Sequence, residues 1–289
     1  MFFSEPEIEM SEEEFRLIRD VIHGHCGLFF DGDTKYLLEK RLAKRLPLHQ
    51  LQGFKDYYHF LKYDRKKDQE LSDLMDVLTT NETYFFREAF QLKALTDEIL
   101  PELKEMKQER GEKTLRIWSA GCSTGEEPYT IAMLVLEMDC FRGWRVEIVG
   151  TDISQRVLQQ SRKAVYGKSS FRATEERYLK RFFQERDGGF RVNDEVRELV
   201  TISHLNLFDQ IRLALLGKMD VILCRNVIIY FDQIAKKKVV ETFYRMLHDG
   251  GYLLLGHSES LMNISTAFCL KHLKNDMVYQ KPASPAGVQ

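Results

Sequence analysis

Residues 117–129 read IWSAGCSTGEEPY, and this stretch decides which fold the chain can adopt. Leu115–Trp118 has the apolar character of a short buried strand. Small residues follow the strand, then two glutamates, and Pro128 suits the first turn of a helix. A strand, a small-residue loop and a helix N-terminus together allow a ligand to lie against bare backbone. The helical pattern continues through Ile131, Ala132, Leu134, Val135 and Leu136.

The loop after this strand carries an acidic pair, Glu126 and Glu127. Carboxylates repel a phosphate but attract a ligand that combines a positive charge with hydroxyl groups. S-adenosylmethionine (AdoMet) is such a ligand, because it carries a sulfonium and a ribose. We therefore expect the loop, including Gly121, to bind AdoMet rather than a nucleotide phosphate.

The composition indicates a folded protein of one large domain or two. Its 289 residues are 44% hydrophobic and 30% charged, and the net charge of -2 argues against bulk nucleic-acid binding. No apolar run reaches the length of a membrane span, and the N-terminus is acidic, unlike a secretion signal. The five cysteines are scattered without a CxxC pair, so we expect reduced thiols and no metal site. These features predict a cytoplasmic protein that does not insert into membranes. We expect a monomer, although the sequence leaves the oligomeric state open.

Apolar spacing up to Thr80 is helical, without strand–helix alternation. Ser11 and Glu14 match a capping box at the start of the first helix. Asp33 or Thr34 is expected to cap a second helix that runs to Leu46, before Pro47. Two more helices are expected, over 53–63 and 68–78. Residues 1–80 are thus predicted to form a helical N-terminal domain.

Strands alternate with helices over the rest of the chain, residues 81–281. This alternation predicts an α/β fold, a Rossmann-like, doubly wound and mostly parallel sheet. Gly251–Leu255 and Met277–Gln280 are expected to form an antiparallel edge. The strands are expected over 115–118, 146–150, 219–223 and 252–255, and the helices over 128–138, 154–164 and 233–247.

One stretch, at about 178–203, interrupts the alternation. Arg181–Gln184, Phe190–Val192 and Val196–Ile202 have the pattern of short strands, and the sequence DGG at 187–189 indicates a turn. We expect a small antiparallel β insertion, or β-subdomain, there. The tail 282–289 is rich in Pro, Ala and Gly and is expected to be disordered.

Polar residues follow the expected strands, at the edge where open parallel sheets bind ligands. Asp152 follows the expected strand 146–150, where a carboxylate can accept hydrogen bonds from ribose hydroxyls. Alternatively, Asp152 caps the helix that begins near Ser154. The two roles are compatible. Asn226 and Tyr230 follow the strand Val221–Leu223 and are expected to line the site.

Other polar residues allow more than one interpretation. Asn206 could bind an adenine or simply start a turn. Cys224 is expected to be a small buried residue rather than a nucleophile, because no histidine and acid partner can be named for it. The histidines form no ligand cluster, which again predicts no metal.

The segment Asn81–Arg87 lies between the two regions. Asn81 and Thr83 offer polar contacts, and Arg87 offers a planar fork suited to a carboxylate. Composition alone favours a structural alternative to ligand binding. In it, Asn81 and Thr83 cap a helix and Phe85 and Phe86 enter the core.

Basic residues form one arc of the second helix. Such a run is usually a solvated face, but it could instead dock an acidic protein. The arc consists of Lys40, Arg41, Lys44 and Arg45.

The motifs above occur together and in a fixed order: Asn81–Arg87, Trp118–Tyr129, Gly150–Ser154, Asn206–Leu207 and Cys224–Asp232. In this combination the chain resembles the CheR family, the chemotaxis receptor glutamate O-methyltransferases. The resemblance covers roughly residues 11–281. It implies an all-α N-terminal domain and a class I AdoMet-dependent methyltransferase domain with an inserted β-subdomain. It also implies methyl transfer to glutamates of chemoreceptor cytoplasmic helices, with S-adenosylhomocysteine (AdoHcy) as the product.

The resemblance also assigns site residues. Arg87 and Tyr230 would face the incoming glutamate and are the expected catalytic residues. Which glutamate of the acidic pair reaches the methionine portion is open, with Glu127 preferred. The basic arc would bind the receptor. The implied cofactor contacts are Asn81, Thr83, Arg87, Glu126, Glu127, Asp152, Asn206, Leu207, Asn226 and Val227, to which the loop adds Gly121.

One feature departs from part of the family. Members that tether to a receptor C-terminal peptide carry a longer glycine-containing loop in the β-subdomain than Gln184–Phe190 here, so tethering is left open. The fold alone does not choose the substrate. The alternatives are a methyltransferase for another protein, a small-molecule carboxylate or a nucleic acid, and a scaffold that binds AdoMet without catalysis.

Overall fold

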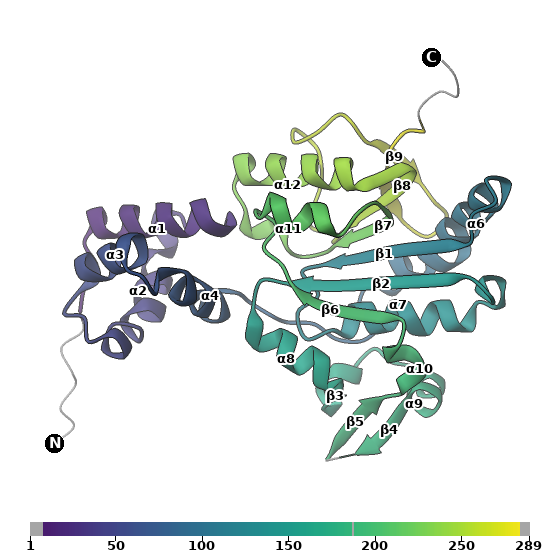
Figure 1. The fold of residues 1–289 in the computed structure, drawn as a ribbon, viewed down its shortest axis with the longest axis horizontal. Coiled ribbons are helices and arrows are strands. Elements are labelled where there is room, and N and C mark those ends of the chain that lie inside the picture. The colour runs from purple at the N-terminus through teal and green to yellow at the C-terminus, as the bar shows by residue number, and fades with distance from the viewer. Residues whose placement is uncertain (1–7, 187, 284–289) are drawn as a thin grey trace. The chain divides into compact units, whose positions relative to one another are not determined.

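The computed structural model describes residues 8–186 and 188–283. Contacts divide the chain into two compact units (Figure 1). The first holds the residues up to Thr80 together with Tyr230–Ala235, and the second holds Asn81–Ile229 and the residues from Lys236 onward. The tail that we expected to be disordered lies, from residue 284 on, outside the described residues.

The first unit consists of helices around an apolar core. The predicted capping box is confirmed, because Ser11 Oγ accepts the N–H of Glu14 at 3.2 Å and Glu14 accepts the N–H of Ser11 at 2.8 Å. Its elements are α1 (Glu12–Cys26), η1 (Gly32–Thr34), α2 (Lys35–Ala43), η2 (Pro47–His49), α3 (Phe54–Tyr63) and α4 (Lys67–Leu78).

The second helix differs from the prediction at both ends. Asp31, rather than Asp33 or Thr34, supplies the capping carboxylate, and it accepts the N–H of Thr34 at 3.0 Å. A turn of 3-10 helix therefore precedes α2. The α-helix ends at Ala43 rather than Leu46, because a turn leads from there into η2.

The segment Tyr230–Ala235 joins the first unit through backbone pairing. The N–H of Phe29 donates to the carbonyl of Tyr230 at 3.0 Å, and Leu28 forms an isolated antiparallel bridge with Phe231. Asp232 also pairs with His23 of α1 at 3.2 Å. Tyr230 is therefore held by the loop that follows α1.

The second unit contains one large and one small sheet with their helices. Its helices are α5 (Ala89–Ala94), the π-helical η3 (Leu95–Ile99), α6 (Leu100–Glu109), α7 (Glu126–Glu137), η4 (Asp139–Phe141), α8 (Gln155–Lys163), η5 (Lys168–Phe171), α9 (Glu176–Phe182), α10 (Asp194–Arg197), α11 (Gln210–Leu215), η6 (Ile228–Tyr230) and α12 (Gln233–Met246), the last two of which share residues with the first unit. Its strands are β1 (Thr114–Ala120), β2 (Arg145–Asp152), β3 (Val165–Tyr166), β4 (Phe183–Arg186), β5 (Gly189–Val192), β6 (Val200–His204), β7 (Met219–Cys224), β8 (Leu247–Leu255), β9 (Cys269–His272) and β10 (Met277–Gln280).

The large sheet has seven strands in the order β6-β2-β1-β7-β8-β10-β9 (Figure 1). The strands from β6 to β8 are parallel, and β10 and β9 add antiparallel partners. The predicted doubly wound sheet and its antiparallel edge are therefore confirmed. From β1 the chain passes to β2 on one side, and it returns later to β7 on the other, so the strand order reverses between β1 and β7. Ligands bind at such a switch point, outside the carboxyl ends of the strands.

Helices cover both faces of the large sheet. Successive side chains of β1 point to opposite faces. Trp118 packs edge-on against Phe243 of α12, with ring centroids 5.4 Å apart. Ile117 instead lies in the apolar cluster that contains Ile131 and Tyr129 of α7. The loop between β1 and α7 is thus fixed by packing on both sides of the strand that precedes it.

The small sheet differs from the predicted insertion. Its order is β3-β5-β4, and Figure 1 shows it next to α8, α9 and α10. Val196–Ile202, predicted as its third strand, instead ends α10 and begins β6, which pairs parallel with β2. The actual third strand, Val165–Tyr166, is two residues long and precedes the other two. Alternating apolar residues identify a strand but not the sheet that it joins.

Candidate active site

The loop that follows β1 approaches the end of β7 closely. Gly121 has a left-handed φ of +84°, and a Cβ atom on it would lie 2.4 Å from Cγ2 of Val227. The N–H groups of Gly121 and Cys122 both donate to the carbonyl of Thr151 at 2.8 Å, which ties the loop to β2. The backbone of Gly121 therefore lies directly against the side chain of Val227 at the switch point.

Asp152 is buried at the end of β2 and organises the same loop. One carboxylate oxygen accepts the N–H of Ser123 at 2.8 Å, and the other accepts the N–H of Ser154 at 2.9 Å. Burial raises the pKa of Asp152 above its ordinary value, and the backbone N–H donors oppose that shift. The backbone N–H of Ile153 also donates to this carboxylate, which leaves about one of its four acceptor sites open. Asp152 thus supports the start of α8 and remains chemically suited to bind ribose hydroxyls.

The two glutamates at the start of α7 occupy different environments. Glu126 is 2% exposed and accepts hydrogen bonds from Thr124 Oγ1 at 2.6 Å and Ser170 Oγ at 3.0 Å. Its pKa is raised by burial. Glu127 instead accepts Ser119 Oγ at 2.6 Å and pairs with Arg225 at 3.1 Å. Only Glu127, whose side chain is 15% exposed, keeps some access to a ligand.

Arg225, which the sequence analysis did not identify, connects several predicted site residues. Its side chain is 3% exposed and lies 3.1 Å from carboxylate oxygens of both Glu127 and Glu88. It also donates to the carbonyl of Arg87 at 2.6 Å. The only signal in the sequence was a charged residue directly after a buried strand.

The segment from Asn81 to Arg87 bonds to the loop between β1 and α7 and to α7 itself. Ser123 Oγ donates to the carbonyl of Asn81 at 3.2 Å, and the N–H of Phe86 donates to Thr130 Oγ1 at 3.2 Å. The predicted alternative of helix capping by Asn81 and Thr83 is wrong, because α4 has ended at Leu78 and α5 begins only at Ala89. The expected core contacts are correct, because Phe85 and Phe86 are buried.

Arg87 lies on a strained stretch of this segment. Its neighbours Phe86 and Glu88 have left-handed φ values of 60° and 59°, which non-glycine residues seldom adopt. One guanidinium nitrogen of Arg87 donates to the carbonyl of Glu82 at 2.9 Å. No carboxylate among residues 8–186 and 188–283 forms an ion pair with Arg87. Arg87 is therefore a cation whose charge is not neutralised by a direct partner.

The turn after β7 is organised by a glutamate that the sequence analysis also missed. Glu259 accepts the backbone N–H groups of Asn226 at 2.8 Å, Val227 at 2.9 Å and Gly256 at 2.7 Å. Burial raises the pKa of Glu259, and these donors oppose the shift. Asn226 adopts a left-handed φ of 58° in this turn, and its side-chain Oδ1 is buried without a hydrogen-bond partner.

The remaining predicted residues of this unit follow β6. Asn206 Oδ1 accepts the N–H of Phe208 at 2.9 Å, so Asn206 does start a turn, one of its two proposed roles. Leu207 is buried. The N–H of Leu205 donates to the carbonyl of Asp152 at 3.0 Å. Asn206 and Leu207 are therefore brought to the same sheet edge as Asp152.

The basic arc of the first unit is divided by the structure. Arg45 forms a two-pronged hydrogen bond with the buried Glu70, and Arg41 donates to the carbonyl of Leu78 at 2.6 Å. Lys40 and Lys44 are exposed. Arg45 thus stabilises the helical unit, and only the two lysines present their charges fully to solvent.

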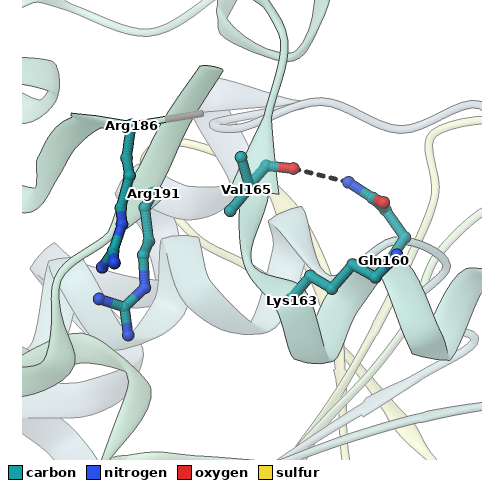
Figure 2. Close-up of a pocket in the computed structure, with 5 residues that line it drawn as sticks. All are labelled: Gln160, Lys163, Val165, Arg186 and Arg191. Carbon is teal, nitrogen blue, oxygen red and sulfur yellow. Dashed lines mark hydrogen bonds between the residues drawn. The ribbon is translucent and has the colours of Figure 1, made fainter. Parts of the chain in front are cut away.

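A separate hollow of about 560 Å³ lies where α8 meets the small sheet. Figure 2 shows Arg186 and Arg191 extending side by side from the hairpin, with Lys163 and Gln160 contributed by α8. Val165 of β3 completes the lining and accepts a hydrogen bond from Gln160 Nε2 at 2.6 Å. None of the predicted cofactor residues lines this hollow. Its three cations would attract an anion.

Comparison with known families identifies the class of protein that the fold and site define. Residues 81–276 match a family described as CheR methyltransferase, SAM binding domain. The chain is therefore an AdoMet-dependent methyltransferase. Residues 13–79 match the CheR methyltransferase, all-alpha domain. Together these matches show that the chain belongs to the CheR methyltransferase family, and they confirm the predicted family, fold class and cofactor.

Curated relatives cover nearly the whole chain. It is 37% identical over 278 residues to chemotaxis protein methyltransferase 2 of Vibrio cholerae serotype O1, covering 96% of this chain and 95% of that protein. It is 36% identical over 258 residues to a chemotaxis protein methyltransferase of Borreliella burgdorferi, covering 88% and 90%. The match supports AdoMet-dependent methylation in chemotaxis. No helix among the described residues is long and apolar enough to cross a membrane.

Two observations show that the residues present fit this cofactor. The orphaned Oδ1 of Asn226 is a buried acceptor, and buried polar atoms without a partner are rare unless a ligand or water satisfies them. The buried carboxylate of Asp152, at the carboxyl end of β2 beside the same loop, suits the hydroxyl groups of a ribose.

Proposed function

We propose that this protein transfers a methyl group from AdoMet to glutamate side chains of chemoreceptor cytoplasmic domains and forms glutamate methyl esters. The names of the relatives support a chemosensory role, and chemoreceptors are the partners that such a role implies. Arg87 is the observation that carries the choice of a carboxylate. It is a cation without a carboxylate partner among the described residues, on a segment tied to the cofactor loop.

We propose that the cofactor is held by the residues at the switch point. Asp152 would accept a hydrogen bond from a ribose hydroxyl, because the backbone N–H groups of Ser123, Ile153 and Ser154 take three of its about four acceptor sites. Asn226 would offer its unpartnered Oδ1 to a donor of the cofactor. Glu127, rather than the more deeply buried Glu126, would lie toward the methionine portion. Five further residues remain proposed cofactor contacts because they match the family motifs. They are Asn81, Thr83, Asn206, Leu207 and Val227.

The bound cofactor supplies a methyl group activated by a sulfonium. The acceptor carboxylate has an ordinary pKa of about 4.3 and is already ionised at neutral pH, so the protein does not need a general base. Arg87 would hold the carboxylate in line with the methyl group. Orientation and replacement of the hydration shell of the carboxylate by fixed dipoles would supply most of the rate acceleration. The part assigned to Tyr230 by resemblance stays a prediction and needs its own variant, Tyr230→Phe.

The receptor surface of the first unit is proposed to include Lys40 and Lys44. Both lysines are exposed, and cations suit a substrate rich in glutamates. Arg41 and Arg45, the other members of the predicted arc, already bind Leu78 and Glu70 within the unit.

The test is incubation of the protein with methyl-labelled AdoMet and receptor cytoplasmic fragments. We expect label that is released by mild base, as a methyl ester is, and that is lost when the glutamates of the fragment are replaced by alanine. Arg87→Ala should lower the single-turnover rate about 100-fold, because misplacing a reacting group costs about that much. Arg110→Ala, at an exposed position after α6, is the matched control. Label that resists base, or that persists without glutamates, would show that the acceptor is not a glutamate carboxylate.

A further inference from the structure

A second arginine lies beside Arg87, on the same tyrosine. The guanidinium carbon of Arg172 is 3.9 Å from the ring centroid of Tyr84, and that of Arg87 is 5.8 Å from it. Arg172 also pairs with Glu82 at 2.7 Å, although 90 residues separate them in the sequence. Nothing in the sequence around Arg172 indicated a role for it.

The backbone that carries Arg172 is anchored to the cofactor site. The N–H of Phe85 donates to the carbonyl of Ser170 at 2.9 Å, and the ring of Phe85 stacks on Phe171 with centroids 5.3 Å apart. Ser170 Oγ in turn donates to Glu126 at the start of α7. Arg172 is thus positioned by the same contacts that fix the segment carrying Arg87.

The ion pair between Arg172 and Glu82 is weak, so another carboxylate can replace Glu82. The side chains of Arg172 and Glu82 are 49% and 71% exposed, and ion pairs at such positions contribute little to stability. The cluster holds two guanidinium groups and one carboxylate, so one positive charge is left over. A second carboxylate can therefore enter without loss of charge balance.

We propose that Arg172 is a second substrate-binding residue, which binds the methyl-accepting carboxylate together with Arg87. Tyr84 holds both guanidinium groups by cation–π contact. Glu82 occupies Arg172 in the free protein and gives way when the acceptor carboxylate arrives. Arg172 acts on substrate binding rather than on the methyl group, so it sets the KM for the receptor. This inference rests on the proposed function.

The experiment compares Arg172→Ala, Arg172→Lys and Glu82→Gln for methylation of a receptor cytoplasmic fragment. Arg172→Ala should raise the KM for the fragment about 10-fold, because it removes one charge-assisted hydrogen bond. The kcat and the AdoHcy affinity measured by calorimetry should stay within about twofold. Arg172→Lys should recover part of the KM, since it keeps the charge but not the fork. Glu82→Gln should lower the KM about threefold, and only while Arg172 is present, because it removes the resident competitor.

Arg177 provides a matched control, because it too lies over a tyrosine ring and pairs with a glutamate. Arg177 lies 4.4 Å from the ring centroid of Tyr178 and pairs with Glu175 at 2.9 Å, at 61% exposure. Arg177→Ala should leave the receptor KM unchanged. An unchanged KM in Arg172→Ala overturns the inference, and so does a loss of AdoHcy affinity, which would indicate a structural role. Absence of base-labile label in the wild type refutes the proposed function instead.

Discussion

Arg225 and Glu127 form an ion pair of 3.1 Å in which only 3% and 15% of the two side chains are exposed. The same guanidinium pairs with Glu88, and it bonds to the backbone of Arg87. One buried cation therefore connects the start of α7 to the segment proposed to orient the substrate.

Replacing Arg225 by alanine should destabilise the second unit strongly. The variant leaves the carboxylates of Glu88 and Glu127 without their cation, and breaking a buried pair costs about 3 kcal/mol or more of unfolding free energy. Urea denaturation followed by tryptophan fluorescence measures the loss, since Trp118 and Trp144 both belong to this unit.

Two further variants test the cause of that loss. Adding Glu127→Gln should recover part of the stability, because one uncompensated charge is removed. Arg145→Ala, in a pair whose arginine is 76% exposed, should change stability by less than about 0.5 kcal/mol. Equal losses for Arg145→Ala and Arg225→Ala would contradict the importance of burial.

Gly121→Ala should distort the cofactor loop. The new Cβ would lie 2.4 Å from Val227 in a backbone with φ of +84°, so both the clash and the left-handed conformation disfavour it. We expect a stability loss of about 2 kcal/mol and weaker AdoHcy binding by calorimetry. Gly111→Ala is the control, because Gly111 has a φ of +71° but no atom within 4 Å of the added Cβ. If both variants lose the same stability and keep AdoHcy affinity, the close approach to Val227 has no bearing on the site.

Asn226→Gly should weaken cofactor binding while preserving the turn. Glycine accepts the left-handed φ of 58° but lacks the unpartnered Oδ1. Loss of one hydrogen bond in a buried site predicts an AdoHcy affinity about 10-fold lower. Asn263→Gly, at an exposed position with φ of 60°, should bind AdoHcy like the wild type. Wild-type affinity in Asn226→Gly would exclude the amide as a cofactor contact.

Glu126→Gln should alter the pH dependence of stability. Burial raises the pKa of Glu126 above its ordinary value of 4.5, so the folded protein retains this proton at pH values where the unfolded chain has lost it. The stabilising effect is complete below the unfolded pKa and is lost as pH rises through the folded pKa. Relative to the wild type, the variant should therefore gain stability as the pH rises above the ordinary value of 4.5.

Urea midpoints across that range measure the effect of Glu126→Gln. Glu109→Gln, at an exposed position of α6, controls for the loss of one negative charge. Parallel stability curves for the wild type and Glu126→Gln would refute the assigned pKa direction.

The parts of the site that could be predicted from sequence are those encoded locally. Gly121 lies in a small-residue loop directly after a strand, and Asp152 ends the next strand, so their chemistry follows from position in a parallel sheet. The helix after the loop could be predicted from its apolar spacing, and its proline marked the first turn.

The parts that could not be predicted depend on contacts between distant segments. Glu259 meets the N–H of Asn226 across 33 residues, and Arg225 meets the carbonyl of Arg87 across 138. A glutamate that accepts backbone N–H groups looks in the sequence like any surface glutamate. The strand β6 was assigned to the wrong sheet for the same reason, since its partner β2 is chosen by the fold and not by its own residues.

Arg87 lies between two left-handed residues, Phe86 and Glu88, each of which stores about 1–3 kcal/mol of conformational strain. A peptide cut from this segment would relax, and its arginine would lose its orientation. The geometry of Arg87 is therefore a property of the whole unit, because Arg225 and the buried Phe86 are needed to keep the strained backbone in place. If the segment Asn81–Arg87 is transplanted into another methyltransferase, Arg225 and Glu88 must be moved with it.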